Sequence, residues 1–173
     1  MNCRQNWSDN CEEELNKQIN AEYECSIAYH YLANYFDRDD VGLDVLVEYY
    51  NKASLEEREH ANNLMKYQNM RGGVVKMENI TVQEILLSKS NDILESFNIA
   101  LELEKSINGK LLNLHKVAEE NNDPQFSDYL EGNYLNEQVE SISKISKIIS
   151  ILERFNGDQH AIWNYISNSI KEM

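Results

Sequence analysis

The sequence predicts an all-α protein, a four-helix bundle with one long crossover and a short fifth helix at its C-terminal end. Only one Pro and six Gly interrupt the 173 residues, and helix-favouring Leu, Ile, Glu and Lys are abundant. Apolar residues also recur at steps of three and four, as on the buried face of a helix. The length and the 42% hydrophobic content fit a single domain over residues 1–173 with a sizeable core.

Four turn-like segments divide the chain. They are a polar turn that begins at Phe36, the Gly72–Gly73 pair, the segment NNDPQ around Pro124 and the segment FNGDQ around Gly157. These segments predict helices at about residues 10–37, 44–71, 89–120, 124–156 and 159–170. The starts at Pro124 and after Asp158 have the clearest signals, because Asp caps a helix well and Pro suits its first position.

The connection over residues 72–88 differs from the others in length. A helix of about 28 residues is about 40 Å long, and a chain running back along it needs at least about 12 extended residues. This connection is long enough, whereas the others are short and join antiparallel neighbours. The second and third helices are therefore predicted to be parallel, the topology of a bundle with one crossover.

The formal charge of −14 disfavours nucleic acid and anionic membrane surfaces and favours cations. No run approaches the roughly 18 apolar residues that span a bilayer, and residues 1–10 lack an apolar signal core. We therefore expect no nucleic-acid or membrane partner and a cytoplasmic location. Cys3, Cys11 and Cys25 are expected to be free thiols, because there is no second Cys cluster to pair with them.

Carboxylates interrupt the predicted apolar faces of three helices. These are Glu22 on the first helix, Glu57 with His60 on the second, and Glu104 on the third, while the fourth offers the neutral Gln138. Three buried carboxylates without compensation would cost several kcal/mol each, so they require protonation or a nearby cation. A pair of divalent metals supplies that charge, and mixed oxygen and nitrogen ligands suit iron or manganese.

Glu57 and His60 are three residues apart and project from one helix face, so together they offer an oxygen and a nitrogen to one metal. The spacing alone is a weak signal, because a lone Glu-x-x-His is more often a solvated pair. Its position opposite the other two carboxylates makes it a candidate metal site. The neighbouring Glu56 and Glu59 fall on a different face.

Several segments resemble, in sequence and in order, eukaryotic ferritins of the heavy-chain, iron-oxidising type. They are YFDRDDV, EEREHA, NMRGG, ALELEK and NDPQFSDYLEGNYLNEQV, and the resemblance covers nearly the whole chain. It implies a hollow shell of 24 subunits, possibly mixed with another ferritin subunit, that oxidises Fe(II) with O₂ and stores Fe(III) as a mineral.

The same resemblance implies a ferroxidase centre with two irons. Glu22 and His60 would bind the first iron, Glu57 would bridge, and Glu104 would bind the second. Tyr29 and Gln138 would be auxiliary contacts. Taken alone, Tyr29 is about as well explained by core packing.

Surface residues also match family features. Asp128 and Glu131 match the acidic pair that lines the threefold channel through which iron enters, with His115 matching a nearby His and Ser127 standing where Cys is frequent. Glu56 and Glu59 would face the cavity and bind nascent mineral, although Asn62 replaces a further Glu.

Three features leave alternatives open. Ile162, Ile166 and Ile170 either pack against the bundle or line an apolar fourfold pore. The spacing of Asp37, Asp39, Gly42 and Glu48 resembles a calcium-binding loop, but Val41 occupies a ligand position. The third concerns function: a shell subunit without oxidase activity conflicts with the complete ligand set, and a di-iron oxygenase conflicts with the missing second Glu-x-x-His. The prediction is therefore a ferroxidase that also stores iron.

Overall fold

The computed structural model describes residues 3–82 and 84–170, and within them every regular element is helical. The predicted all-α class is confirmed. The helices are α1 (Asp9–Phe36), α2 (Asp44–Met70), α3 (Asp92–Glu120), α4 (Pro124–Leu130), α5 (Asn136–Arg154) and α6 (Gln159–Tyr165), and two short π-helical segments are η1 (Glu131–Leu135) and η2 (Ile166–Ile170).

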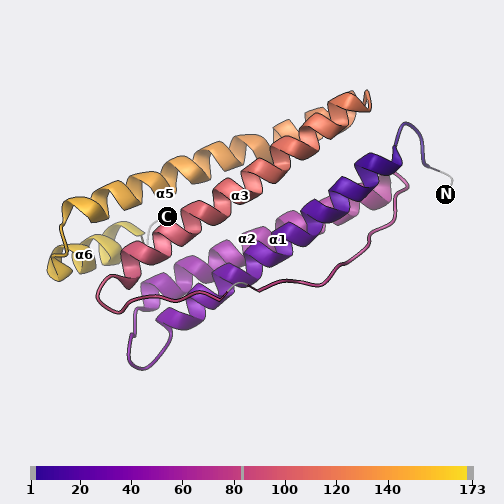
Figure 1. The fold of residues 1–173 in the computed structure, drawn as a ribbon. Coiled ribbons are helices and arrows are strands. Elements are labelled where there is room, and N and C mark those ends of the chain that lie inside the picture. The colour runs from indigo at the N-terminus through magenta and orange to yellow at the C-terminus, as the bar shows by residue number, and fades with distance from the viewer. Residues whose placement is uncertain (1–2, 83, 171–173) are drawn as a thin grey trace.

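The long helices form two antiparallel pairs, α1 with α2 and α3 with α5, and α1 also packs against α3 (Figure 1). The connection after α2 runs back along the bundle, so that α2 and α3 point in the same direction. This is the predicted topology with one crossover. The short α6 lies at one end of the bundle, where η2 contacts α2.

Side chains of α1 hold the backbone of the crossover. The side-chain amide of Asn16 makes two hydrogen bonds to the crossover. Its Nδ2 donates to the carbonyl of Val74 over 3.0 Å, and its Oδ1 accepts from the backbone N–H of Lys76 over 3.0 Å. One and two turns further along α1, Asn20 and Glu24 accept from the next crossover N–H groups. A polar stripe on one face of α1 therefore provides hydrogen-bond partners for the backbone of the crossover, whose described residues between α2 and α3 form no helix or strand.

The bundle core is apolar toward its two ends and polar in the middle. Toward one end, Tyr29, Tyr50, Phe36 and Phe97 pack together; toward the other, Trp7, Tyr67 and Phe126 do. Between these two groups, α1 and α2 lie close together. The hydroxyl of Ser26 donates to the carbonyl of Ser54 and the hydroxyl of Ser54 donates to the carbonyl of Ser26, each over 2.7 Å. The buried carboxylates lie in this middle layer.

The predicted helix 124–156 is one rod with a π-turn inside it. Phe126, Leu130, Tyr134 and Gln138 are all buried, and they follow one another at three successive steps of four residues. An α-helix turns once in 3.6 residues, so residues spaced by four drift around its axis. In a regular α-helix the last members of this row would no longer face the core. The wider π-turn of η1 absorbs the difference, and this spacing is the signal for it in the sequence.

Most predicted helix ends lie close to the observed ones. Asp123 caps α4 by accepting from the backbone N–H of Phe126, and Asp158 caps α6. The third helix starts at Asp92 rather than 89, because residues 88–91 form a turn in which the N–H of Asn91 bonds the carbonyl of Ser88 over 2.8 Å. Within the described residues, no helix is both long and apolar enough to cross a membrane.

Candidate metal centre

Three side chains from two helices converge in the middle of the bundle. Glu22 comes from α1, and Glu57 and His60 come from α2. One ligand atom of each lies within 4.8 Å of the others. Glu22 is 0% exposed and Glu57 is 4% exposed. The spacing of three residues puts Glu57 and His60 on the face of α2 that meets α1, so the sequence places all three in one layer of the core.

The donor atoms of this cluster fit a cation. Among the described residues, the buried carboxylate oxygens that have no hydrogen-bond partner are Oε2 of Glu22 and Oε2 of Glu57. The other oxygen of Glu22 accepts a hydrogen bond from Nε2 of Gln18 over 2.7 Å. An unpartnered buried carboxylate oxygen is costly, and two such oxygens side by side are stabilised by a positive charge between them.

The electrostatics of the cluster agree with this conclusion. Burial raises the pKa of Glu22 well above its usual value, and the nearby Glu57 carboxylate raises it further. Burial likewise raises the pKa of Glu57, to about 8. Near neutral pH the metal-free cluster therefore retains protons that a divalent cation would displace.

Glu104 lies close by but is held by other partners. Its carboxylate accepts from the hydroxyl of Tyr29 over 2.5 Å and from Nε2 of Gln138 over 3.1 Å. Burial raises the pKa of Glu104, and the Tyr29 hydrogen bond acts in the opposite direction. Glu104 is not part of the group of ligand atoms within 4.8 Å. For Tyr29 both core packing against Tyr50 and a hydrogen bond to a candidate ligand are observed, so its role as an auxiliary contact stays a prediction.

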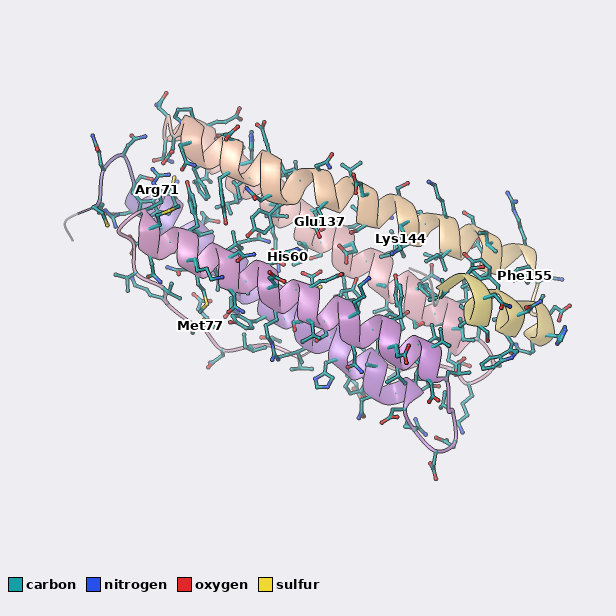
Figure 2. The ribbon with its side chains drawn as sticks, turned by 180° about the vertical axis from the view of Figure 1, so that it is seen from behind. His60, Arg71, Met77, Glu137, Lys144 and Phe155 are labelled. Carbon is teal, nitrogen blue, oxygen red and sulfur yellow. The ribbon has the colours of Figure 1, made fainter. Side chains whose placement is uncertain are left out.

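Two residues that the sequence analysis did not single out touch the cluster. Gln18 is the donor to Glu22. Glu137, on α5, brings its Oε2 to 3.3 Å from Nε2 of His60, and Figure 2 shows these two side chains between α2 and α5. The spacing of four residues between Gln18 and Glu22 could have predicted from the sequence that the two side chains are in contact. Glu137 is half exposed, and no pattern in the sequence indicated its contact with His60.

Two clefts reach the centre from the side of α2 and α5. The larger, of about 440 Å³, is lined by His60, Glu137, Glu56, Glu59 and Tyr134, among others. The smaller, of about 80 Å³, is lined by Tyr29, Glu104, Glu56 and both Lys52 and Lys144. Solvent and small solutes can therefore approach His60 and Glu104 from this face, while Glu22 is closed off.

The predicted surface residues lie as follows. Glu56 and Glu59 are exposed beside the larger cleft. Asp128 is exposed, and Glu131 is exposed with its Oε1 2.7 Å from Nε2 of His115. Their assignment to a channel and to a mineral surface stays a prediction.

The isoleucine row of the last helix is buried within its own chain. Ile162, Ile166 and Ile170 are 7%, 0% and 2% exposed, and η2 contacts α2. Of the two interpretations of this row, packing against the bundle is observed within the chain, and a pore lining between copies stays a prediction.

A four-helix bundle with one crossover, and with a candidate metal site of two buried carboxylates and a partly exposed imidazole in its middle layer, is typical of one class, the helical-bundle metal proteins. Within this class, residues 12–155 match the family model described as Ferritin-like domain. The chain belongs to this ferritin-like family.

Similar proteins include "Ferritin, chloroplastic" of Malus baccata var. xiaojinensis, which is 48% identical over 94% of this chain and 65% of the relative. "Ferritin-3, chloroplastic" of Glycine max is 47% identical over 94% of this chain and 64% of the relative. "Ferritin-4, chloroplastic" of Arabidopsis thaliana is 46% identical over 94% and 63%. The chain spans slightly less than two thirds of the length of these relatives.

These comparisons correct one expectation. The cytoplasmic location expected from the sequence is wrong, because the relatives are named as chloroplastic ferritins. The charge and the missing apolar core at residues 1–10 could not separate these compartments, since both contain soluble acidic proteins.

Proposed function

We propose that this protein takes up and stores iron, and that it is a ferroxidase of the heavy-chain type. Fe(II) would be oxidised by O₂ inside the bundle, and Fe(III) would be kept as a mineral within a hollow shell of 24 copies, pure or mixed with another ferritin subunit. The observation that carries this proposal is the pair of buried, unpartnered carboxylate oxygens on Glu22 and Glu57 beside His60.

The family resemblance assigns a role to each candidate ligand. Glu22 and His60 would bind a first iron, Glu57 would bridge, and Glu104 would bind the second. Carboxylates favour Fe(III) over Fe(II), and the clefts leave room for O₂. Tyr29 and Gln138 would orient Glu104, since both donate hydrogen bonds to its carboxylate.

The second iron position would be the weaker one. Glu104 already has two donors, and the fourth helix adds only the neutral Gln138. Oxidised iron would therefore leave this position readily and move on to storage. Two irons retained permanently by each chain after turnover would contradict this transit role.

The remaining roles follow the family resemblance. Asp128 and Glu131 would line the channel through which iron enters, and Glu56 and Glu59 would bind iron at the cavity surface. The names of the relatives also favour a plastid location. A fusion of the full gene product to a fluorescent protein tests the last point.

The ferroxidase proposal is tested by aerobic Fe(II) oxidation in a stopped-flow instrument. Wild-type protein is compared with Glu57→Ala/His60→Ala at the same assembly state, verified by sedimentation. We expect a fast oxidation phase in the wild type and its loss in the variant while the assembly persists. A wild type that lacks the fast phase would contradict the enzymatic part and leave an iron container.

A further inference from the structure

Three tyrosine rings follow one another along the larger cleft, starting beside His60. The ring centroids of His60 and Tyr134 are 5.6 Å apart, those of Tyr134 and Tyr129 are 5.8 Å apart, and those of Tyr129 and Tyr67 are 4.0 Å apart. All four residues line this cleft. Tyrosine gives up one electron and one proton more readily than most side chains do. A row of close tyrosine rings therefore offers a path along which oxidising equivalents can move.

The first step of this path is a contact between two hydroxyl groups. Those of Tyr134 and Tyr129 are hydrogen-bond partners 3.4 Å apart. Each also lies near a carbonyl of α2, that of His60 at 3.4 Å from Tyr134 and that of Asn63 at 3.3 Å from Tyr129. A hydroxyl hydrogen rotates between its acceptors, so Tyr129 can donate to Tyr134. A phenoxyl radical on Tyr134 would take this hydrogen atom. The O–H bond of Tyr129 then breaks, that of Tyr134 forms again, and the radical lies on Tyr129.

The surroundings of the rings give this path an end point. Tyr134 is 3% exposed, whereas Tyr129 is only partly buried. Beyond it, Tyr67 is fully buried, and its hydroxyl accepts a hydrogen bond from Nη1 of Arg71 over 2.6 Å. The guanidinium of Arg71 also lies 5.6 Å from the centre of the Tyr67 ring. A cation attracts the electrons of a ring that it faces, so Tyr67 is harder to oxidise than Tyr129. The radical therefore stays on Tyr129, beside solvent.

We propose that Tyr134 and Tyr129 form a relay that carries single oxidising equivalents from the inner part of the cleft to solvent, where a reductant of the ascorbate class removes them. The source of the oxidant rests on the proposed function. O₂ that takes two electrons from Fe(II) becomes hydrogen peroxide, and peroxide with another Fe(II) gives Fe(III), hydroxide and a hydroxyl radical. The hydroxyl radical takes a hydrogen atom from Tyr134 and becomes water. At Tyr129, ascorbate returns a hydrogen atom and becomes the ascorbyl radical, so both tyrosines are regenerated.

The relay can be tested in metal-free protein. Azide radicals, made by irradiating an azide solution, remove one electron from a tyrosine and become azide ions while its proton goes to solvent. The chain has ten tyrosines, and peptide mass spectrometry locates the oxidation products on each. Tyr129→Phe keeps the stacked ring and removes only the hydroxyl. With ascorbate present, we expect several-fold more oxidation of Tyr134 in this variant than in the wild type, because its radical no longer passes to Tyr129.

Tyr31→Phe is the matched control. Tyr31 is 44% exposed and lies on α1, which contributes no described residue to the larger cleft. This variant also removes one accessible phenol, and it should leave the oxidation of Tyr134 unchanged. Unchanged oxidation of Tyr134 in Tyr129→Phe would overturn the relay. An equal rise in both variants would overturn it too, because the effect would then reflect only the loss of one competing tyrosine.

Electron paramagnetic resonance follows the radical when iron is present. Protein mixed with Fe(II), hydrogen peroxide and ascorbate is frozen at successive times. We expect a phenoxyl signal that decays faster in the wild type than in Tyr129→Phe, and equal decay would overturn the relay. Failure of the proposed function gives a different result. The phenoxyl signal would then be missing from both proteins, while the azide experiment on metal-free protein would still decide whether Tyr134 passes its radical to Tyr129.

Discussion

Gln18 and Glu22 lie one helical turn apart on α1, and Nε2 of Gln18 donates a hydrogen bond to Oε1 of Glu22 over 2.7 Å. Both residues are nearly inaccessible to solvent. Because one oxygen of Glu22 is occupied in this way, the unpartnered Oε2 is the atom left for a cation. An amide that is not itself a candidate ligand thus orients the carboxylate of one, with its unpartnered oxygen toward the cluster.

Replacing Gln18 by Leu should weaken metal binding. The substitution removes the donor, so the carboxylate of Glu22 loses its fixed orientation, and we expect about 10-fold weaker Zn(II) binding by calorimetry. Gln159→Leu, which removes an exposed amide on α6, should bind like the wild type. Equal affinities of Gln18→Leu and Gln159→Leu would contradict the orienting role.

The metal-free protein should lose stability as the pH rises from about 5 to 8. The pKa of Glu57 is about 8 in the folded protein and 4.5 without its environment, so the folded state binds more protons across this interval and is progressively destabilised. At roughly 1.4 kcal/mol for each pKa unit, the loss is about 3–5 kcal/mol per chain. Thermal unfolding midpoints of metal-free protein, compared with Glu57→Gln at each pH, measure it.

The Glu57→Gln comparison isolates this effect from the general repulsion of an acidic chain. The variant should show a clearly flatter pH dependence. Added Zn(II) should reverse the trend in the wild type, because the metal displaces the bound proton and its own affinity rises with pH. Parallel curves for the two proteins would show that Glu57 does not hold the proton.

Asp123→Ala should be among the most destabilising substitutions away from the metal centre. Asp123 is 2% exposed, pairs with Arg71 over 2.5 Å and caps α4 at the N–H of Phe126. Its removal loses the cap and leaves the Arg71 charge unpaired, which should cost about 3–5 kcal/mol. Asp158→Ala removes only an exposed cap and should cost about 1 kcal/mol. Denaturant unfolding at one protein concentration compares them.

Two glycine substitutions should change the stability of the folded protein in opposite directions. Gly109 lies inside α3, and a Cβ there meets nothing within 4 Å, so Gly109→Ala should stabilise the protein by about 0.5–1 kcal/mol through helix propensity. A Cβ on Gly73 would lie 2.5 Å from Oε1 of Gln68 and 2.7 Å from Nε1 of Trp7. Gly73→Ala should therefore lower the thermal midpoint, and a rise in that midpoint would contradict the packing described.

The sequence was sufficient for the helices, for the parallel course of α2 and α3, and for the burial of Glu22, Glu57 and Glu104. Each follows from local spacing or from the length of a connection. It was insufficient for Glu137, whose partner lies on α2. That contact depends on the distance between two helices that are far apart in the chain, and helical periodicity assigns Glu137 to the outer surface.

The π-turn of η1 also limits which changes of sequence length the chain can tolerate during evolution. It adds one residue to a helix whose two ends are both packed, so deleting any residue of 131–135 would rotate one end by about 100° relative to the other. Phe126 and Leu130 would leave the core, or Gln138 and the isoleucines after it would. During evolution, single substitutions in this helix can therefore be accepted one at a time. A deletion or insertion of one residue could be accepted only together with several compensating substitutions in the core.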